Sequence, residues 1–176
     1  MRLFLWLLSV VALLGACTAN PVPEDPGPND SFVFGYIDME DAPTNLGWLT
    51  IRQFAPVVEE PYYYAGTHDG AFFSWYLPSP GSFAITGFGG SSGRTHYTFN
   101  VPREVEQFRF KIKNKGIYYL GSYKYKDVAT GFFEAGKFNI ERVNKPTEKE
   151  LLAKLIELTA GTVVEPKLRA RLKELK

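Results

Sequence analysis

The chain has 176 residues, with 20 Lys and Arg side chains, 19 Asp and Glu side chains, two histidines and one cysteine. Without residues 1–16, which include Arg2, it carries 19 basic and 19 acidic side chains. This balance argues against a nucleic-acid partner, because binding to phosphates needs a basic face. A single cysteine excludes a disulfide bond within the chain.

The first 16 residues have the pattern of a secretory signal peptide. A short basic start, Met1-Arg2, precedes an apolar run from Leu3 to Leu14 and the small residues Gly15 and Ala16. About twelve apolar residues are too few to span a bilayer, which takes roughly 20. A buried core helix is the alternative, and the absence of any polar face along the run argues against it. The pattern therefore predicts export.

The residues around the cysteine sharpen this prediction. Leu14-Gly15-Ala16-Cys17 resembles the lipobox of bacterial lipoproteins. The resemblance implies cleavage between Ala16 and Cys17, lipid on the Cys17 thiol, and attachment to a membrane of the cell envelope. Thr18 stands where an aspartate favours the inner membrane in enterobacterial lipoproteins, so the outer membrane is expected. Ordinary cleavage that leaves a free thiol and an uncleaved anchor are the alternatives.

Residues 17–30 read as a tether that follows the lipidated cysteine. Four prolines lie at Pro21, Pro23, Pro26 and Pro28 among small and acidic residues. Prolines at this spacing favour an extended, solvated polyproline II chain, which is a semi-rigid spacer. A polyproline recognition motif is the alternative.

Residues 31–143 predict a mainly β domain. Short runs of β-branched and aromatic residues alternate with turn-forming clusters, and alternation is clearest over residues 106–113, where Phe108, Phe110 and Ile112 alternate with basic residues. About seven to nine such strands with regular punctuation are typical of an antiparallel β-sandwich. The basic stretch near residues 109–127 is expected to be a solvated strand face.

Residues 144–176 change period and predict two short helices. Thr147 with Glu150 forms a capping box, Gly161 can end the first helix, and Pro166 suits the first turn of the second. The apolar stripes are Leu151, Leu152, Leu155 and Leu158, and then Leu168, Leu172 and Leu175. We expect both helices to pack on the β domain, with docking of a partner on the last helix as the alternative.

The stretch GTHDGAFFSWYLPSPGSFAITGF, residues 66–88, carries a second resemblance. The Asp69-Gly70 turn, the aromatic strand after it and the reversal at Pro78 to Gly81 make it similar to carboxypeptidase regulatory-like, prealbumin-type sandwich domains. Ser79 interrupts the usual Pro-Pro-Gly of that family. The resemblance implies a β-sandwich used for binding, stabilisation or display, and no enzymatic activity.

Catalytic and metal-binding signals are weak. The two histidines, His68 and His96, lie in a predicted turn and strand, and their spacing matches no known ligand array. Residues 89–93 have the Gly-x-Ser-x-Gly spacing but not the strand-to-helix context of a nucleophile elbow, and the Gly-rich segment of residues 87–93 has no following lysine. We expect no catalytic residue, metal or cofactor.

Aromatic runs are the feature that most suggests binding. Consecutive aromatic residues in a strand point to both faces, so each run places some rings outside the core. These rings are either covered by the C-terminal helices or exposed as a contact surface. The candidates for such a surface are Tyr62, Tyr63, Tyr64, Trp75 and Tyr76, taken as a group.

Three functions are compatible with these features. The first is a non-catalytic, lipid-anchored accessory module that binds another envelope protein. The second is a lipoprotein that binds envelope glycan by stacking it on exposed aromatic rings. The third is an envelope hydrolase that uses His68 or His96.

Overall fold

A computed structural model describes residues 27–102, 105–128 and 137–175. The signal peptide, Ala16, Cys17 and most of the tether lie outside these described residues, so their predicted roles stay predictions. Nothing in the described part is a helix long and apolar enough to cross a membrane.

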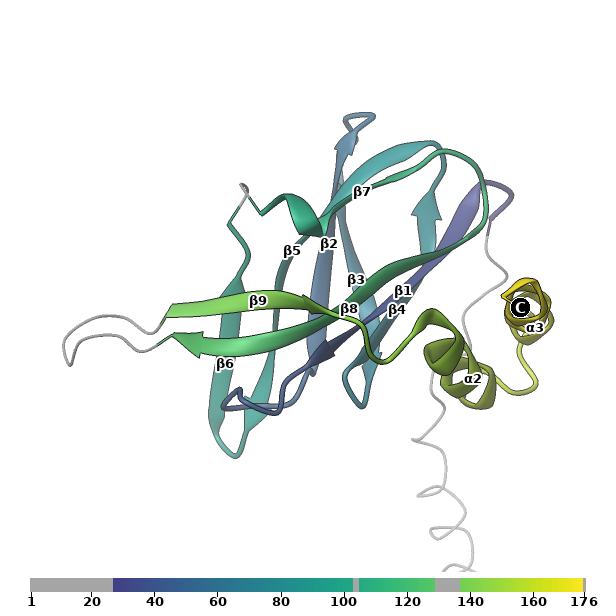
Figure 1. Cartoon of the computed structure of the whole chain (residues 1–176). Helices are drawn as coiled ribbons and strands as arrows, with labels where there is room; N and C mark the ends of the chain where they lie inside the picture. The colour runs from purple at the N-terminus through teal and green to yellow at the C-terminus, as the bar shows by residue number, and fades with distance from the viewer. Residues whose placement is uncertain (1–26, 103–104, 129–136, 176) are drawn as a thin grey trace, which may run out of the picture.

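Within the described residues, nine strands and two C-terminal helices make up the fold (Figure 1), which confirms the predicted mainly β fold class. The strands are β1 (Asp30–Asp38), β2 (Trp48–Ala55), β3 (Tyr62–His68), β4 (Ala71–Pro78), β5 (Gly81–Ser92), β6 (Thr95–Asn100), β7 (Arg109–Ile112), β8 (Ile117–Val128) and β9 (Lys137–Val143). A 3-10 turn, η1 (Glu106–Phe108), precedes β7, and the helices are α2 (Glu148–Leu158) and α3 (Glu165–Glu174).

All nine strands belong to one sheet, with the order β6-β5-β2-β3-β4-β1-β8-β9 and with β7 paired to β5. Neighbouring strands are antiparallel except β1 and β8, which run parallel, so the sheet is mixed rather than wholly antiparallel. Hydrophobic periodicity carries no information on strand direction, and a parallel pair needs only a long connection, which residues 39–116 provide here.

The sheet rolls into a nearly closed barrel, so that its two halves face each other across the core. Phe99 of β6 lies 5.0 Å from Tyr125 of β8 and 5.3 Å from Phe138 of β9, measured between ring centroids. The ends of the sheet therefore meet through their aromatic side chains. The core between the halves is mostly aliphatic and phenyl, and includes Ile51, Phe72 and Phe88.

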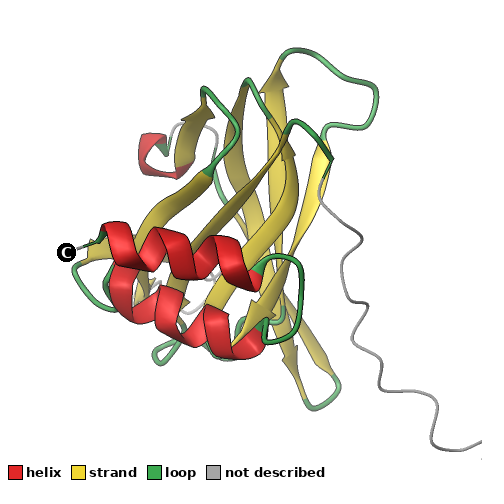
Figure 2. Cartoon of the chain, turned by 90° about the vertical axis from the view of Figure 1, so that its right-hand side faces the viewer, coloured by secondary structure: helices red, strands yellow, loops and turns green. Residues whose placement is uncertain are grey.

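The helices cover the outside of the barrel over only three strands. Figure 2 shows α2 and α3 lying across one side of the sheet. Beneath them lies a second apolar cluster, whose buried sheet residues come from β1 and β4, with the partly buried Ile117 and Tyr119 from β8. Its members include Phe32, Phe34, Trp75 and the α2 residues Leu151, Leu152 and Leu155.

The helix boundaries follow the predicted signals. Thr147 caps α2, its hydroxyl accepts from the Glu150 backbone N–H, and the Glu150 carboxylate accepts from the Thr147 backbone N–H at 2.7 Å. Gly161 has φ +79° between the helices, and Pro166 lies in the first turn of α3. Leu158 differs from expectation: it is exposed, and Ile156 is buried in its place.

We expect acid to weaken the start of α2. The backbone hydrogen bond from Thr147 holds the pKa of Glu150 below its ordinary value of 4.5. A carboxyl with a lowered folded-state pKa adds stability that is complete above its unfolded pKa and is lost as the pH falls through the folded pKa. Unfolding free energies measured from pH 6 to pH 3 should therefore show a decline below about pH 4.5 that is smaller in Glu150→Gln. Equal declines in the two proteins would contradict this assignment.

Candidate functional site

The half of the barrel that no helix covers carries a group of outward aromatic side chains around one arginine. We call this group the aromatic face and define it as Trp48, Arg52, Phe54, Tyr62 and Tyr64. Its residues come from β2 and β3, which pair with Arg52 opposite Tyr62 and Thr50 opposite Tyr64. Because side chains alternate across a strand, Tyr62 and Tyr64 point to the same side. They are 53% and 77% exposed.

Arg52 lies at the centre of the aromatic face. Its guanidinium carbon is 5.2 Å from the ring centroid of Phe54 and 5.4 Å from that of Tyr62. A guanidinium placed against aromatic rings is attracted by their negative faces. The Arg52 Nε is buried and has no hydrogen-bond partner.

Trp48 extends the aromatic face along β2. A side chain on Gly89 would contact the Trp48 ring at 2.8 Å, and one on Gly87 would contact it at 3.6 Å. A side chain at Gly89 would therefore displace the indole. Trp48 lies on the outer surface of the sheet because its neighbour Leu49 points into the core.

The β2–β3 hairpin that carries the aromatic face is held together by hydrogen bonds between its own residues. The Gln53 Nε2 donates to the Pro56 carbonyl at 3.0 Å, the Tyr63 hydroxyl donates to Gln53 Oε1 at 2.8 Å, and the Gln53 backbone N–H donates to the Pro61 carbonyl at 2.7 Å. Burial raises the pKa of Tyr63, with a smaller contribution from the charge of Asp30. Val57 and Val58, in the loop between the hydrogen-bonded residues Pro56 and Pro61, are exposed. The hairpin is therefore preorganised, which lowers the entropy cost of binding.

The five aromatic residues predicted as one binding surface are separated by the structure. Tyr62 and Tyr64 lie together on the aromatic face, and Tyr63 points inward to the core edge. Trp75 is only 7% exposed and packs under the helices, so it cannot act as an exposed contact residue in this conformation. Tyr76 is exposed on β4, beyond the point where β3 and β4 stop pairing.

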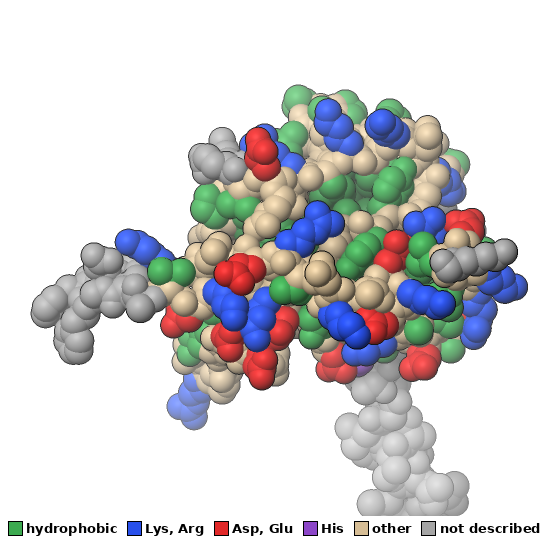
Figure 3. Space-filling view, in the orientation of Figure 1, with side chains coloured by type: hydrophobic (Ala, Val, Ile, Leu, Met, Phe, Trp, Pro, Cys, Tyr) green, Lys and Arg blue, Asp and Glu red, His purple; other side chains and the backbone are tan. Residues whose placement is uncertain are grey.

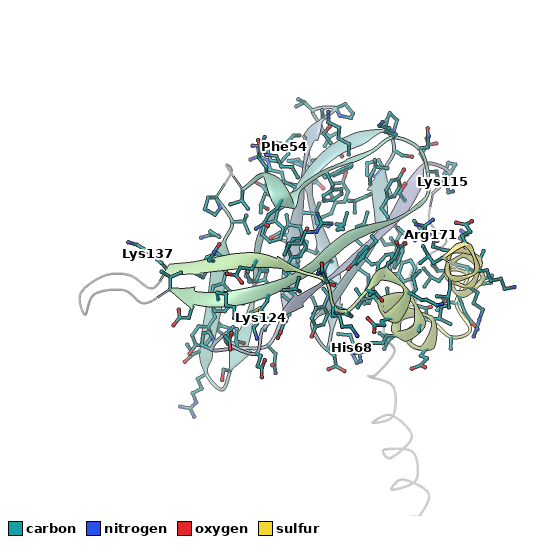
Figure 4. All side chains as sticks on the ribbon, in the orientation of Figure 1. Phe54, His68, Lys115, Lys124, Lys137 and Arg171 are labelled. Carbon is teal, nitrogen blue, oxygen red and sulfur yellow. The ribbon has the colours of Figure 1, made fainter. Side chains whose placement is uncertain are left out.

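The two expectations for the outer rings each hold for a different part of the sheet. The helices cover the outward rings of Phe32, Phe34, Phe73, Trp75 and Tyr119, whereas Phe54, Tyr62 and Tyr64 stay exposed. In Figure 4, Phe54 lies near the top of the barrel, away from the helices, and Arg171 lies at the side next to α3.

A groove of about 790 Å³ lies between α3 and the sheet. Phe32, Trp75 and Ile117 are among its apolar lining residues. Its basic groups already have partners: Arg171 pairs with Glu148 at 2.9 Å and with Glu174 at 3.1 Å, and Lys115 donates to the Gly27 carbonyl at 3.1 Å. Arg171 and Lys115 therefore already have acceptors within the chain, and we do not assign this groove a ligand.

Neither histidine lies on the aromatic face. His68 is 3.5 Å from Asp69 in the exposed turn between β3 and β4. The His96 Nδ1 lies 2.8 Å from the Ser91 hydroxyl near the tip of the β5–β6 hairpin, and both residues are exposed. A hydrolytic triad needs a third group to orient the imidazole, and within residues 27–102, 105–128 and 137–175 no carboxylate bonds to His96. Over the same ranges, no three His, Cys, Asp or Glu residues are grouped so that they could hold a metal.

Sequence reasoning missed three of the five members of the aromatic face. The available signal was their spacing. Trp48, Thr50, Arg52 and Phe54 occupy every second position of one strand, so their side chains must lie on the same face.

The predicted turns of residues 66–88 are present: Asp69 has φ +46°, Gly70 has φ +78°, and β5 begins directly after Ser79-Pro80. A comparison of the whole chain with family models, curated proteins and solved structures finds no match in any of the three. The resemblances to the lipobox and to carboxypeptidase regulatory-like domains therefore remain predictions.

Proposed function

We propose that this protein is a lipid-anchored, non-catalytic accessory module of the cell envelope that binds another envelope protein through the aromatic face. Cys17 carries the lipid, residues 18–30 form the tether, and the outer membrane is the expected location. The observation that carries the binding function is the gathering of exposed aromatic side chains around Arg52 on the half of the barrel left open by the helices.

The composition of this surface favours a protein partner. Tyr, Trp, Phe and Arg are enriched in protein interfaces, and the residues that dominate binding energy are most often Trp, Tyr and Arg. In the part of the chain that the structure describes, five of the large hydrophobic residues that remain exposed lie on β2, β3 and the loop between them: Phe54, Val57, Val58, Tyr62 and Tyr64. Such a concentration marks an interaction site more often than a scattered set does.

A glycan is the second candidate, because flat outward rings can stack on sugars. Sugar hydroxyls also need nearby hydrogen-bonding side chains, and on the outer face of β2 and β3 these are Thr50, Arg52 and the two tyrosine hydroxyls. Binding of soluble envelope oligosaccharides that is lost in Tyr62→Ala would favour the glycan function over the protein one.

Photocross-linking in living cells tests the proposal. With p-benzoylphenylalanine in place of Tyr64, we expect a discrete envelope protein to be captured, because this side chain is the most exposed ring of the aromatic face. The matched control carries the same photoreactive residue in place of Leu158, which is 43% exposed on α2. Equal capture at both positions would show that the aromatic face is not the contact surface.

Fractionation tests the anchor separately. Cys17→Ser removes the thiol to which the lipid would be attached, so we expect the chain to leave the membrane fraction. Two or three acyl chains hold a protein on a membrane almost permanently, whereas this domain alone has no spanning helix among its described residues. If Cys17→Ser stays with the membranes as the parent chain does, the lipobox interpretation is wrong.

A further inference from the structure

The charged residues on the sheet are unevenly distributed. Strands β2, β3, β5, β6 and β7 contain no Asp or Glu at all, whereas β1, β8 and β9 contain Asp30, Asp38, Asp127 and Glu141. On the acid-free strands the cations are Arg52, Arg109 and Lys111. In Figure 3 the upper edge of the molecule, where the β2–β3 hairpin lies in Figure 1, shows mostly hydrophobic and basic side chains.

These three cations lie on the same outer surface. Ala84 of β5 pairs with Arg52 on one side and with Arg109 on the other, so the three residues form one row across the sheet. With neighbouring strands about 4.8 Å apart, the Cα atoms of Arg52 and Arg109 lie roughly 10 Å apart, and only an alanine side chain lies between them. Lys111 is opposite Ser82, two residues along the same strand from Arg109, and therefore points the same way.

An apolar hollow opens beside the row. It has a volume of about 390 Å³ and is lined by Phe54, Ser82, Phe83, Arg109, Phe110 and Lys111. Phe54, Phe83 and Phe110 contribute its apolar lining, and Arg109 and Lys111 are the charged residues beside it. It can take one apolar side chain of a partner, which is the form of a hot-spot pocket.

Arg52 supplies an independent indication of an anionic ligand. Its Nε is buried without a hydrogen-bond partner, and within the described ranges no carboxylate is paired with its guanidinium. A buried donor without an acceptor costs free energy, which an arriving acceptor restores. The covering rings of Phe54 and Tyr62 are themselves 39% and 53% exposed, so a small shift of either ring opens the nitrogen to a carboxylate. The acids nearest in the chain, Glu59 and Glu60 of the hairpin loop, make no ion pair with it.

We propose that the partner bound by the aromatic face presents an acidic protein segment: a carboxylate that binds Arg52, next to an apolar side chain that enters the hollow beside Phe54. This inference rests on the proposed function and adds the chemistry of the partner. Arg52 is suited to the role because its guanidinium lies against two rings, and the planar fork of a guanidinium can bind a carboxylate through two parallel hydrogen bonds.

Two measurements on the full chain in native envelopes test the proposal. First, a carbodiimide joins Lys111 Nζ to a contacting carboxylate through an amide bond, with the reagent taking up the water. We expect a cross-linked peptide that joins Lys111 to an Asp or Glu of the protein captured at position 64, and no such product in Lys111→Arg, which keeps the charge.

Second, Arg52→Glu should lower photocapture at position 64 by about tenfold or more, as expected for a hot-spot arginine. Lys154→Glu, an equal charge change on the exposed side of α2, should leave capture unchanged.

The outcomes separate this inference from the proposed function. If no protein is captured at position 64, the proposed function fails and the inference fails with it. If a protein is captured equally by Arg52→Glu and no Lys111 amide forms, the inference is overturned and the proposed function stands. Capture of a lipid or glycan at position 64, or binding of the Cys17→Ser chain to phosphatidylglycerol vesicles that Arg52→Glu abolishes, would replace the acidic protein with an anionic envelope molecule.

Discussion

Replacing Trp75 with alanine is expected to lower the free energy of unfolding by about 3–5 kcal/mol, as for other buried Trp side chains. Trp75 lies between β4 and the helices, with its ring centroid 4.2 Å from Phe32 and 5.8 Å from Phe73. Removing the indole would leave a cavity in a cluster that cannot close without moving α2. Urea or guanidinium unfolding followed by circular dichroism measures the change.

Tyr64→Ala is the matched control, because Trp75 and Tyr64 were predicted to belong to one surface. The Tyr64 ring is 77% exposed, so its loss should change the unfolding free energy by no more than about 0.5 kcal/mol. Partner binding should show the reverse order: Tyr64→Ala should weaken it directly, whereas Trp75→Ala should weaken it only through loss of folding. A large loss of stability in Tyr64→Ala, or none in Trp75→Ala, would contradict the division of these rings between core and aromatic face.

Leu155→Asp is expected to have a still larger effect, about 4 kcal/mol or more, because it places an unpaired carboxylate in an apolar cluster. Leu155 is fully buried between α2 and the sheet, together with Leu151 and Leu152. We expect α2 to detach, which would expose Phe32 and Trp75 to water. Binding of a hydrophobic dye and a red shift of tryptophan emission would report that exposure.

Lys154→Asp is the control for charge on the same helix. Lys154 is exposed one position before Leu155, so the new aspartate stays in solvent and stability should change little. If Leu155→Asp were as stable as Lys154→Asp, the helices would not be packed on the sheet as described.

Much of the fold is predictable because its signals are local. The alternation of Phe108, Phe110 and Ile112 predicts the strand β7, although residues 106–108 form the 3-10 turn η1 instead of its first residues. The Thr147–Glu150 pair predicts the first turn of α2. Strand direction is not local. The parallel pairing of β1 with β8 joins segments about 85 residues apart, and no property of either segment distinguishes it from an antiparallel pair.

The site is only partly predictable, for a related reason. Tyr62 to Tyr64 and Phe72 to Tyr76 are equally aromatic, and their composition does not say which rings the helices will cover. That depends on the docking of α2 on β1 and β4, a contact between distant parts of the chain. Arg52 was missed because a single arginine in a strand is ordinary, and its role is visible only when Phe54 and Tyr62 are placed on either side of it.

The position of β1 determines how the domain bears a mechanical load. Any tension along the chain that precedes Gly27 is applied to β1, which is hydrogen-bonded on both sides, to β4 and to β8. A strand at the edge of a sheet can be peeled away one hydrogen bond at a time, whereas a strand in the middle must break two ladders together in shear. A domain pulled from its N-terminus at a membrane while its hairpin holds a partner would therefore resist unfolding at the very element to which the force is delivered.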